Sequence, residues 1–118
     1  MNAPSLLPDD LLASGDVRRI HVRAASLDPS ASRELLRDTQ AAFAAGARAV
    51  VIDLAGVTFI DSLGVSALVA ASRRAPLGTR VVLCSLGVYA QTVARVTHLH
   101  EIFAIYATAD AAVAALTV

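Results

Sequence analysis

The sequence contains no lysine and no tryptophan, and it has only two tyrosines and three phenylalanines. Its ten basic residues are all arginines, and ten Asp and Glu residues balance them to a formal net charge of zero. A protein that binds nucleic acid usually carries a basic patch, and single-stranded nucleic acid stacks on aromatic side chains. The composition therefore argues against direct binding to nucleic acid.

Cysteine and long apolar runs are also scarce. The single cysteine, Cys84, excludes a disulfide within the chain and a site with several thiolate ligands. Although 56% of the residues are hydrophobic, no run approaches the roughly 20 apolar residues of a membrane-spanning helix. Asp9 and Asp10 stand where a secretory signal would have its apolar core. We therefore expect a cytoplasmic protein that does not insert into a membrane.

Three residues with metal-binding side chains lie together near the C-terminal end, His98, His100 and Glu101. In an extended segment the two imidazoles would point to the same side. Paired histidines at a turn between a helix and a strand are more often simply exposed, so we expect neither a bound metal nor a cofactor.

The 118 residues suffice for one domain. Segments with strand and helix character alternate along them, which predicts an α/β fold: a single mixed, largely parallel β-sheet of four or five strands with about four α-helices packed on it. Residues 1–10, which include Pro4 and Pro8, are expected to form a flexible N-terminal arm, and residues 11–118 the domain. A first edge strand is expected near Leu11 and Leu12.

The expected elements follow from apolar periodicity and from helix start and stop signals. Strands are expected at 20–25, 49–52, 81–84 and 102–106. Helices are expected after Asp28 and Asp61, from about Val88, and from Thr108 to Leu116. Asp28-Pro29 and Thr108 are suitable helix starts, and Gly46 is a suitable stop.

The pair Asp61-Ser62 precedes an apolar, helix-like run. A hydroxyl at a helix N-terminus lies among unpaired backbone N–H groups, where a phosphate would be tolerated because the helix end favours an anion. The same pair is also a common N-cap, and spacing alone does not separate a regulated serine from a cap. Ile60 stands where the nucleophile elbow of serine hydrolases requires glycine, so we expect no enzymatic activity and no catalytic residue.

Residues 50–71 resemble the central signature of the STAS domain, which anti-sigma-factor antagonists share with the cytoplasmic tails of sulfate transporters. The matching positions are Asp53, Leu54, Gly56, Val57, Phe59, Ile60, Asp61, Ser62 and Gly64. The similarity extends over about residues 15–117. Leu63 stands where many antagonists have a second serine, and Ala25-Ser26 replaces a Gly-Glu pair.

The resemblance implies regulation by partner switching. The unphosphorylated protein would bind an anti-sigma factor that is also a serine kinase of the histidine-kinase-like ATPase type, which would free the sigma factor. Phosphorylation of Ser62 would end this binding, and a metal-dependent serine phosphatase would restore it. Among the residues expected to bind the partner, Leu63, Val65 and Leu68 would form an exposed apolar surface. The full set of expected partner-binding residues is Asp28, Asp61, Ser62, Leu63, Gly64, Val65 and Leu68.

Other STAS domains are small subunits of lipid-transport ABC complexes or parts of signalling assemblies. In that alternative, the helix that begins at Ser62 packs against a partner constitutively and without phosphorylation.

Overall fold

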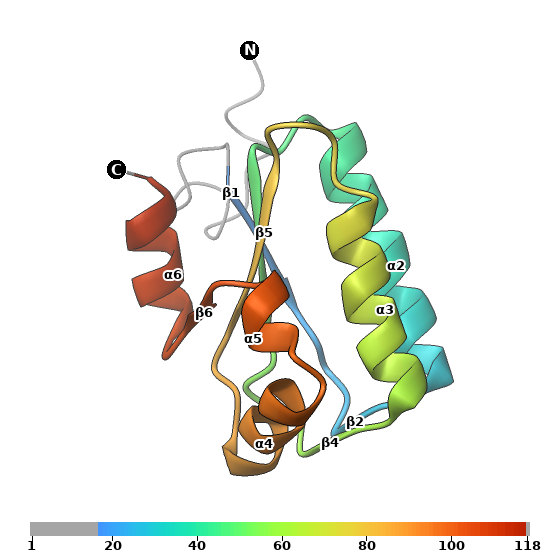
Figure 1. Cartoon of the computed structure of the whole chain (residues 1–118). Coiled ribbons are helices and arrows are strands. Elements are labelled where there is room, and N and C mark those ends of the chain that lie inside the picture. Colours follow the sequence, from blue (N-terminus) through green and yellow to red (C-terminus); the bar gives the residue numbers. More distant parts are fainter. Residues whose placement is uncertain (1–16, 118) are drawn as a thin grey trace.

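Strands and helices alternate along residues 17–117, the part of the chain that the computed structural model describes (Figure 1). The strands are β1 (Val17–His21), β2 (Ser26–Leu27), β3 (Ala49–Asp53), β4 (Phe59–Ile60), β5 (Arg80–Cys84) and β6 (Ile105–Tyr106). The helices are α2 (Pro29–Ala44), α3 (Ser62–Arg73), α4 (Val88–Val96), α5 (Leu99–Ile102) and α6 (Ala109–Leu116). The predicted arm at 1–10 and the predicted strand near Leu11 lie outside the described residues.

The main sheet has four strands in the order β1-β3-β5-β6, and its three pairings are parallel. The predicted α/β architecture with a largely parallel sheet is therefore confirmed. Strands β2 and β4 form a separate parallel pair of two residues each, which the sequence did not predict.

Both faces of the main sheet are covered by helices. All five residues of β3 are buried, as the continuous apolar run predicts. Because side chains alternate along a strand, Val50 and Ile52 join the larger core with α2 and α3, while Val51 packs on the opposite face with α6. Figure 1 shows this arrangement, with α6 on one side of the sheet and α2 and α3 on the other.

Three predicted helix starts are confirmed by their caps. The side chains of Asp28, Asp61 and Thr108 each accept a hydrogen bond from a backbone N–H three residues later, at 2.9, 2.8 and 3.0 Å. Gly46, the predicted stop of the first helix, has a φ of +86°, a conformation that glycine adopts without steric cost.

The prediction of a strand at 102–106 is wrong in its first half. Residues 99–102 form the short helix α5, and only Ile105–Tyr106 pair with β5. Leu99 and Phe103 are buried, whereas Ile102 is 49% exposed. A burial period of four residues is typical of a helix, and a short apolar run does not by itself distinguish the two structures.

Candidate functional site

The pairing of β2 with β4 brings the beginnings of α2 and α3 together. Leu27 lies opposite Ile60 in this parallel pair. Asp28 follows Leu27 and caps α2, while Asp61 follows Ile60 and caps α3. Two helix N-termini, each capped by an aspartate, therefore lie side by side.

Ser62 is the first residue of α3 and is exposed. The cap of this helix is Asp61, whose Oδ1 accepts the Gly64 N–H at 2.8 Å. Among residues 17–117 the Ser62 hydroxyl has no hydrogen-bond partner. This hydroxyl is thus accessible and is not needed for capping, and it stands at the helix end that favours negative charge.

Gly64 is buried where α3 packs tightly on β2. A Cβ at this position would lie 2.7 Å from the Leu27 carbonyl oxygen and 2.9 Å from Cγ2 of Ile60. A side chain here would therefore force the neighbouring backbone or side chains to shift. Gly64 therefore sets how closely the start of α3 approaches β2, and it does not itself present a surface to a partner.

The three apolar residues expected to form an exposed surface differ in burial. Leu63 is 55% exposed, Val65 is half-buried against the core, and Leu68 is fully buried. The expectation that Leu68 is exposed is wrong, because Leu68 follows Gly64 by one helical turn and shares its buried face. Of the three, Leu63 is exposed enough to contact a partner directly, and Val65 is partly exposed.

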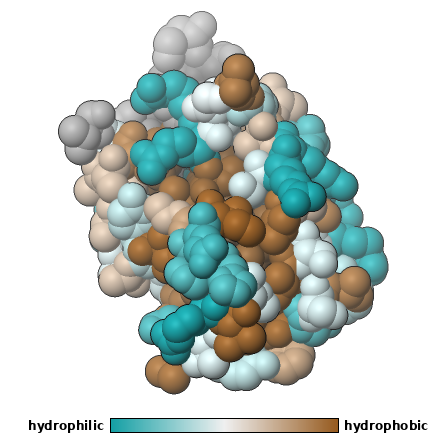
Figure 2. All heavy atoms as spheres, in the orientation of Figure 1, coloured by the Kyte–Doolittle hydropathy of each residue, from teal (hydrophilic) through white to brown (hydrophobic). Residues whose placement is uncertain are grey.

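Sequence reasoning missed an exposed aromatic pair, one member of which precedes Ser62 by three residues. The rings of Phe59 in β4 and Tyr89 in α4 stack with a centroid distance of 5.7 Å, and each residue is 47% exposed. Val88, next to Tyr89, is 84% exposed. Apolar surface accordingly reaches the lower end of the molecule, where α4 and the start of α3 lie (Figures 1 and 2). Phe59 could have been found from strand alternation, since it directly precedes the buried Ile60.

The polar groups at the end of β3 make a structural cluster. The Asp53 carboxylate accepts the Ala55 N–H at 3.0 Å, as expected for a residue that caps a turn. It also lies 3.9 Å from the Arg19 guanidinium and 3.5 Å from the His21 ring. Nearby Cys84 is fully buried, and burial raises the pKa of its thiol.

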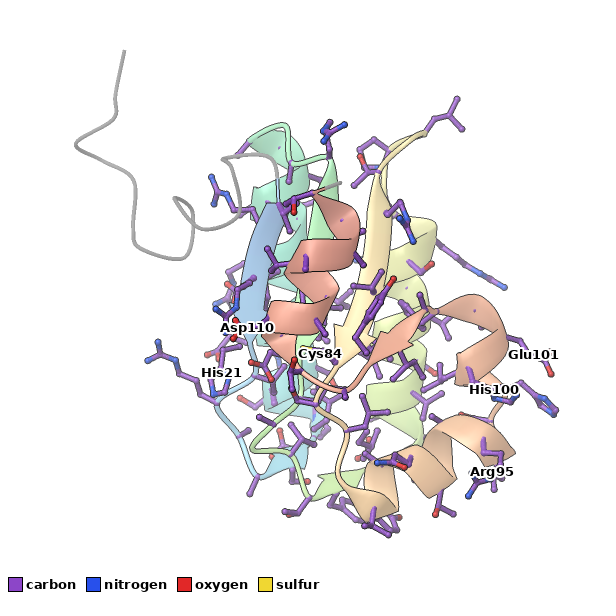
Figure 3. All side chains as sticks on the ribbon, turned by 90° about the vertical axis from the view of Figure 1, so that its left-hand side faces the viewer. His21, Cys84, Arg95, His100, Glu101 and Asp110 are labelled. Atoms are coloured by element: carbon purple, nitrogen blue, oxygen red, sulfur yellow. The ribbon has the colours of Figure 1, made fainter. Side chains whose placement is uncertain are left out.

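None of the three histidines is hydrogen-bonded to Ser62: His21 contacts Asp53, and His98 and His100 contact Glu101. His21 lies on the opposite side of the molecule from His100 and Glu101 (Figure 3). Residues 17–117 contain no group of three or more His, Cys, Asp or Glu side chains that could hold a metal ion. His98 instead pairs with Glu101 at 3.0 Å on the exposed surface.

None of the helices between residues 17 and 117 combines the length and the apolar character that crossing a membrane requires.

Comparison with known proteins points to one family. The sequence model of the STAS domain matches residues 14–112. An anti-sigma factor antagonist from Mycobacterium paratuberculosis is 27% identical with a TM-score of 0.71, over 79% of this chain and 80% of that one. An anti-sigma-factor antagonist (STAS) domain protein from Planctomyces limnophilus is also 27% identical, with a TM-score of 0.73 over 85% and 90% of the two chains.

The anti-sigma factor antagonist SpoIIAA, solved in its unphosphorylated form, has the same fold. It is 19% identical with a TM-score of 0.72, over 86% of this chain and 90% of that one. No curated protein matches the chain significantly.

Proposed function

This chain belongs to the STAS domain family, and from that premise we propose that it is a bacterial anti-sigma-factor antagonist that acts by partner switching. The unphosphorylated form binds an anti-sigma factor that is also a serine kinase of the histidine-kinase-like ATPase type. This binding frees the sigma factor for transcription. The protein itself is a ligand and a kinase substrate in the cytoplasm, without catalysis of its own.

The observation that carries the proposal is the position of Ser62. Its hydroxyl is exposed at the start of α3 while Asp61 caps the helix, so a kinase can reach it and a phosphate can be added without loss of the cap. The similarity to two antagonists at 27% identity supports the choice of partner class.

The surroundings of Ser62 suit a docking surface. Leu63 is 55% exposed on one side, and the stacked pair of Phe59 and Tyr89 supplies exposed aromatic area. Aromatic side chains often dominate the binding energy of protein interfaces. We therefore assign Leu63, Phe59 and Tyr89 to the contact with the anti-sigma factor.

Phosphorylation of Ser62 ends the binding through charge. A phosphate adds about −1.5 to −2 charge, next to the carboxylate of Asp61. Burying this charge against a partner without a counter-ion is costly, and a cost of about 3 kcal/mol lowers affinity more than a hundredfold. A metal-dependent serine phosphatase would restore the binding form.

The test is a pull-down from lysate of the native cells with four baits: wild type, Ser62→Asp, Ser62→Asn and Ser62→Ala. Asparagine matches aspartate in size but has no charge. We expect an ATPase-type kinase on the wild-type and Ser62→Asn baits, reduced about a hundredfold on Ser62→Asp. A Ser62→Ala bait should hold the same partner and release none of it after incubation with ATP.

Two outcomes would overturn the proposal. The first is equal retention of the kinase by the wild-type and Ser62→Asp baits, which would show that charge at Ser62 has no effect. The second is retention of transporter subunits by all baits alike, which would indicate a constitutive STAS subunit.

A further inference from the structure

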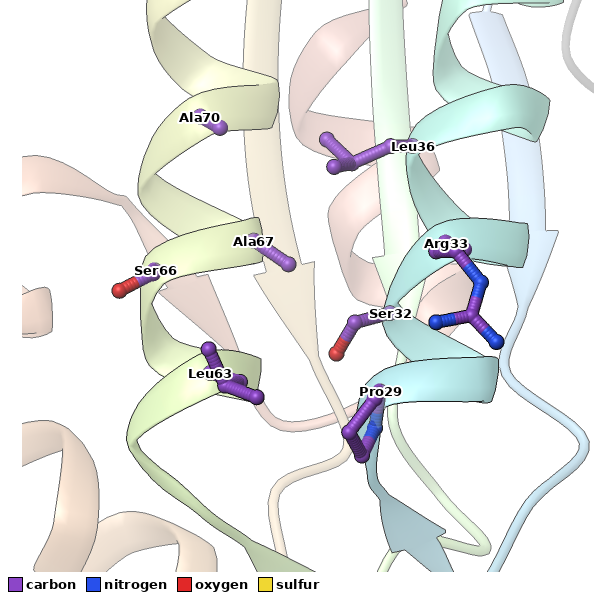
Figure 4. A pocket seen from close by; sticks show the side chains of 8 residues that line it. All are labelled: Pro29, Ser32, Arg33, Leu36, Leu63, Ser66, Ala67 and Ala70. Carbon is purple, nitrogen blue, oxygen red and sulfur yellow. The ribbon is translucent and has the colours of Figure 1, made fainter.

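A groove of about 330 Å³ runs between α2 and α3. Figure 4 shows the side chains that line it from both helices. Apolar groups of Leu36, Ala67 and Ala70 line its upper part, and Leu63 lies at its lower end. Its volume lies at the lower end of the range for small-molecule sites.

A buried hydroxyl without a partner faces this groove. Ser32 is 6% exposed, and its Oγ has no hydrogen-bond partner among residues 17–117. Figure 4 shows the oxygen pointing into the space between the two helices. Buried hydroxyls are normally hydrogen-bonded, so a bound molecule with an acceptor oxygen would satisfy this group.

The rim of the groove carries one basic side chain. Arg33 lines the groove and forms no ion pair within the described part of the chain. Glu34 and Asp38 line a different hollow beside β1. Asp28 and Asp61 stand at the same end of the two helices, where each accepts a backbone N–H as a cap, and neither lines the groove. Helix α3 has no acidic residue between Ser62 and Arg73. A guanidinium without an ion pair and a buried hydroxyl without a partner among the described residues, next to apolar side chains, fit an amphipathic anion.

We propose that this groove binds a small aliphatic carboxylate. Its carboxylate accepts the Ser32 hydroxyl and pairs with the Arg33 guanidinium, while its chain lies along Leu36, Ala67 and Ala70. The span from Leu63 to Ala70 on α3 is about 10 Å at 1.5 Å per residue, which accommodates a chain of about eight carbons. The proposal does not depend on phosphorylation of Ser62.

The test is a titration of the ¹⁵N-labelled protein with octanoate, followed by amide chemical shifts. We expect saturable shifts at Ser32, Ala67 and Ala70, and no saturation with octanol, which lacks the charge. Arg33→Gln should weaken binding about fivefold, as expected for an exposed ion pair. Ser32→Ala should weaken it by a similar factor, because it removes one hydrogen bond to the carboxylate. Ala70→Leu should abolish it by filling the groove.

Arg37→Gln is the matched control, because Arg37 lies one turn further along α2, is exposed as Arg33 is, and does not line the groove. It should bind octanoate as the wild type does. The ¹⁵N spectrum of each variant in the absence of octanoate reports whether the fold is intact.

The proposal is overturned if hexanoate, octanoate and decanoate all fail to give saturable shifts. It is also overturned if octanol binds as well as octanoate, or if Arg33→Gln and Arg37→Gln behave alike. Shifts of the groove amides by a partner protein and not by octanoate would make the groove a protein contact instead.

Discussion

Replacement of Gly64 by alanine tests how tightly α3 is packed on β2. The added Cβ would lie 2.7 Å from the Leu27 carbonyl oxygen, 2.9 Å from Ile60 Cγ2 and 3.0 Å from Leu27 Cγ. Carbon atoms in good contact are about 3.5–4.0 Å apart. Leu27 is fully buried and its backbone is held by the pairing of β2 with β4, so the carbonyl has little freedom to retreat.

The magnitude follows from two opposing effects. Overpacking of this kind lowers the free energy of unfolding by about 1–3 kcal/mol. The higher helix propensity of alanine raises it by up to about 1 kcal/mol. We expect a net loss of roughly 1–2 kcal/mol in the free energy of unfolding. For a domain of this size, that lowers Tm by about 3–12 °C.

The assay is thermal and urea unfolding followed by circular dichroism. Gly56→Ala is the control, because a Cβ at Gly56 meets no atom within 4 Å and its φ is not in the left-handed region. We expect Gly56→Ala to have unchanged or slightly higher stability. A Tm of Gly64→Ala at or above that of the wild type would refute the steric reasoning.

Three further outcomes are expected from burial and capping. Leu68→Ala removes a fully buried side chain and should lower the free energy of unfolding in urea by about 2–5 kcal/mol. Leu63→Ala, at a 55% exposed position, should change it by less than about 0.5 kcal/mol. Equal losses in the two variants would contradict a buried Leu68 and an exposed Leu63. Asp28→Ala removes the α2 cap and should lower the free energy of unfolding by about 1 kcal/mol, with Asp28→Asn close to wild type. Burial raises the pKa of the Cys84 thiol above its ordinary value of 9.0, so folding favours the protonated thiol. The contribution of this group to stability is therefore complete below pH 9.0 and is lost as the pH rises through the raised pKa. Ellman's reagent should therefore not react with Cys84 in the native protein at neutral pH, and fast native labelling would show that the thiol is accessible.

Much of the fold was predictable because it depends on local signals. The caps at Asp28 and Thr108 were predicted from residue type and position, and the structure confirms them. At Asp61-Ser62 the sequence predicted a helix start without deciding which residue caps it, and the structure shows that Asp61 does. The buried run at 49–52 was identified from continuous apolar character, which is typical of a strand covered on both faces.

The arrangement of the site was less predictable because it depends on pairing between distant residues. Strands β2 and β4 have two residues each, which is too short for a periodic pattern. Their pairing nevertheless brings Asp28 beside Asp61, residues that are 33 positions apart. A sequence pattern identifies each cap but not that the two helices begin next to each other.

The error at Leu68 has a geometric cause. Leu63 and Leu68 are five positions apart, which at 3.6 residues per turn places them about 140° apart around the helix. One of the two must therefore face the core when the other is exposed. The sequence showed both to be apolar, and only the direction of packing decides which is buried.

Neighbouring residues in the first turns of α3 have different structural roles. Asp61 caps the helix, Gly64 sets its distance from β2, and Leu68 anchors it in the core. Ser62 and Leu63 are left exposed and free of these tasks, so a change of charge at Ser62 alters the surface without removing a contact that stabilises the fold. The proposed switch therefore requires that Ser62→Asp weaken partner binding with little change in Tm. Substitutions at Gly64 or Leu68 should weaken partner binding only to the extent that they lower the stability of the fold.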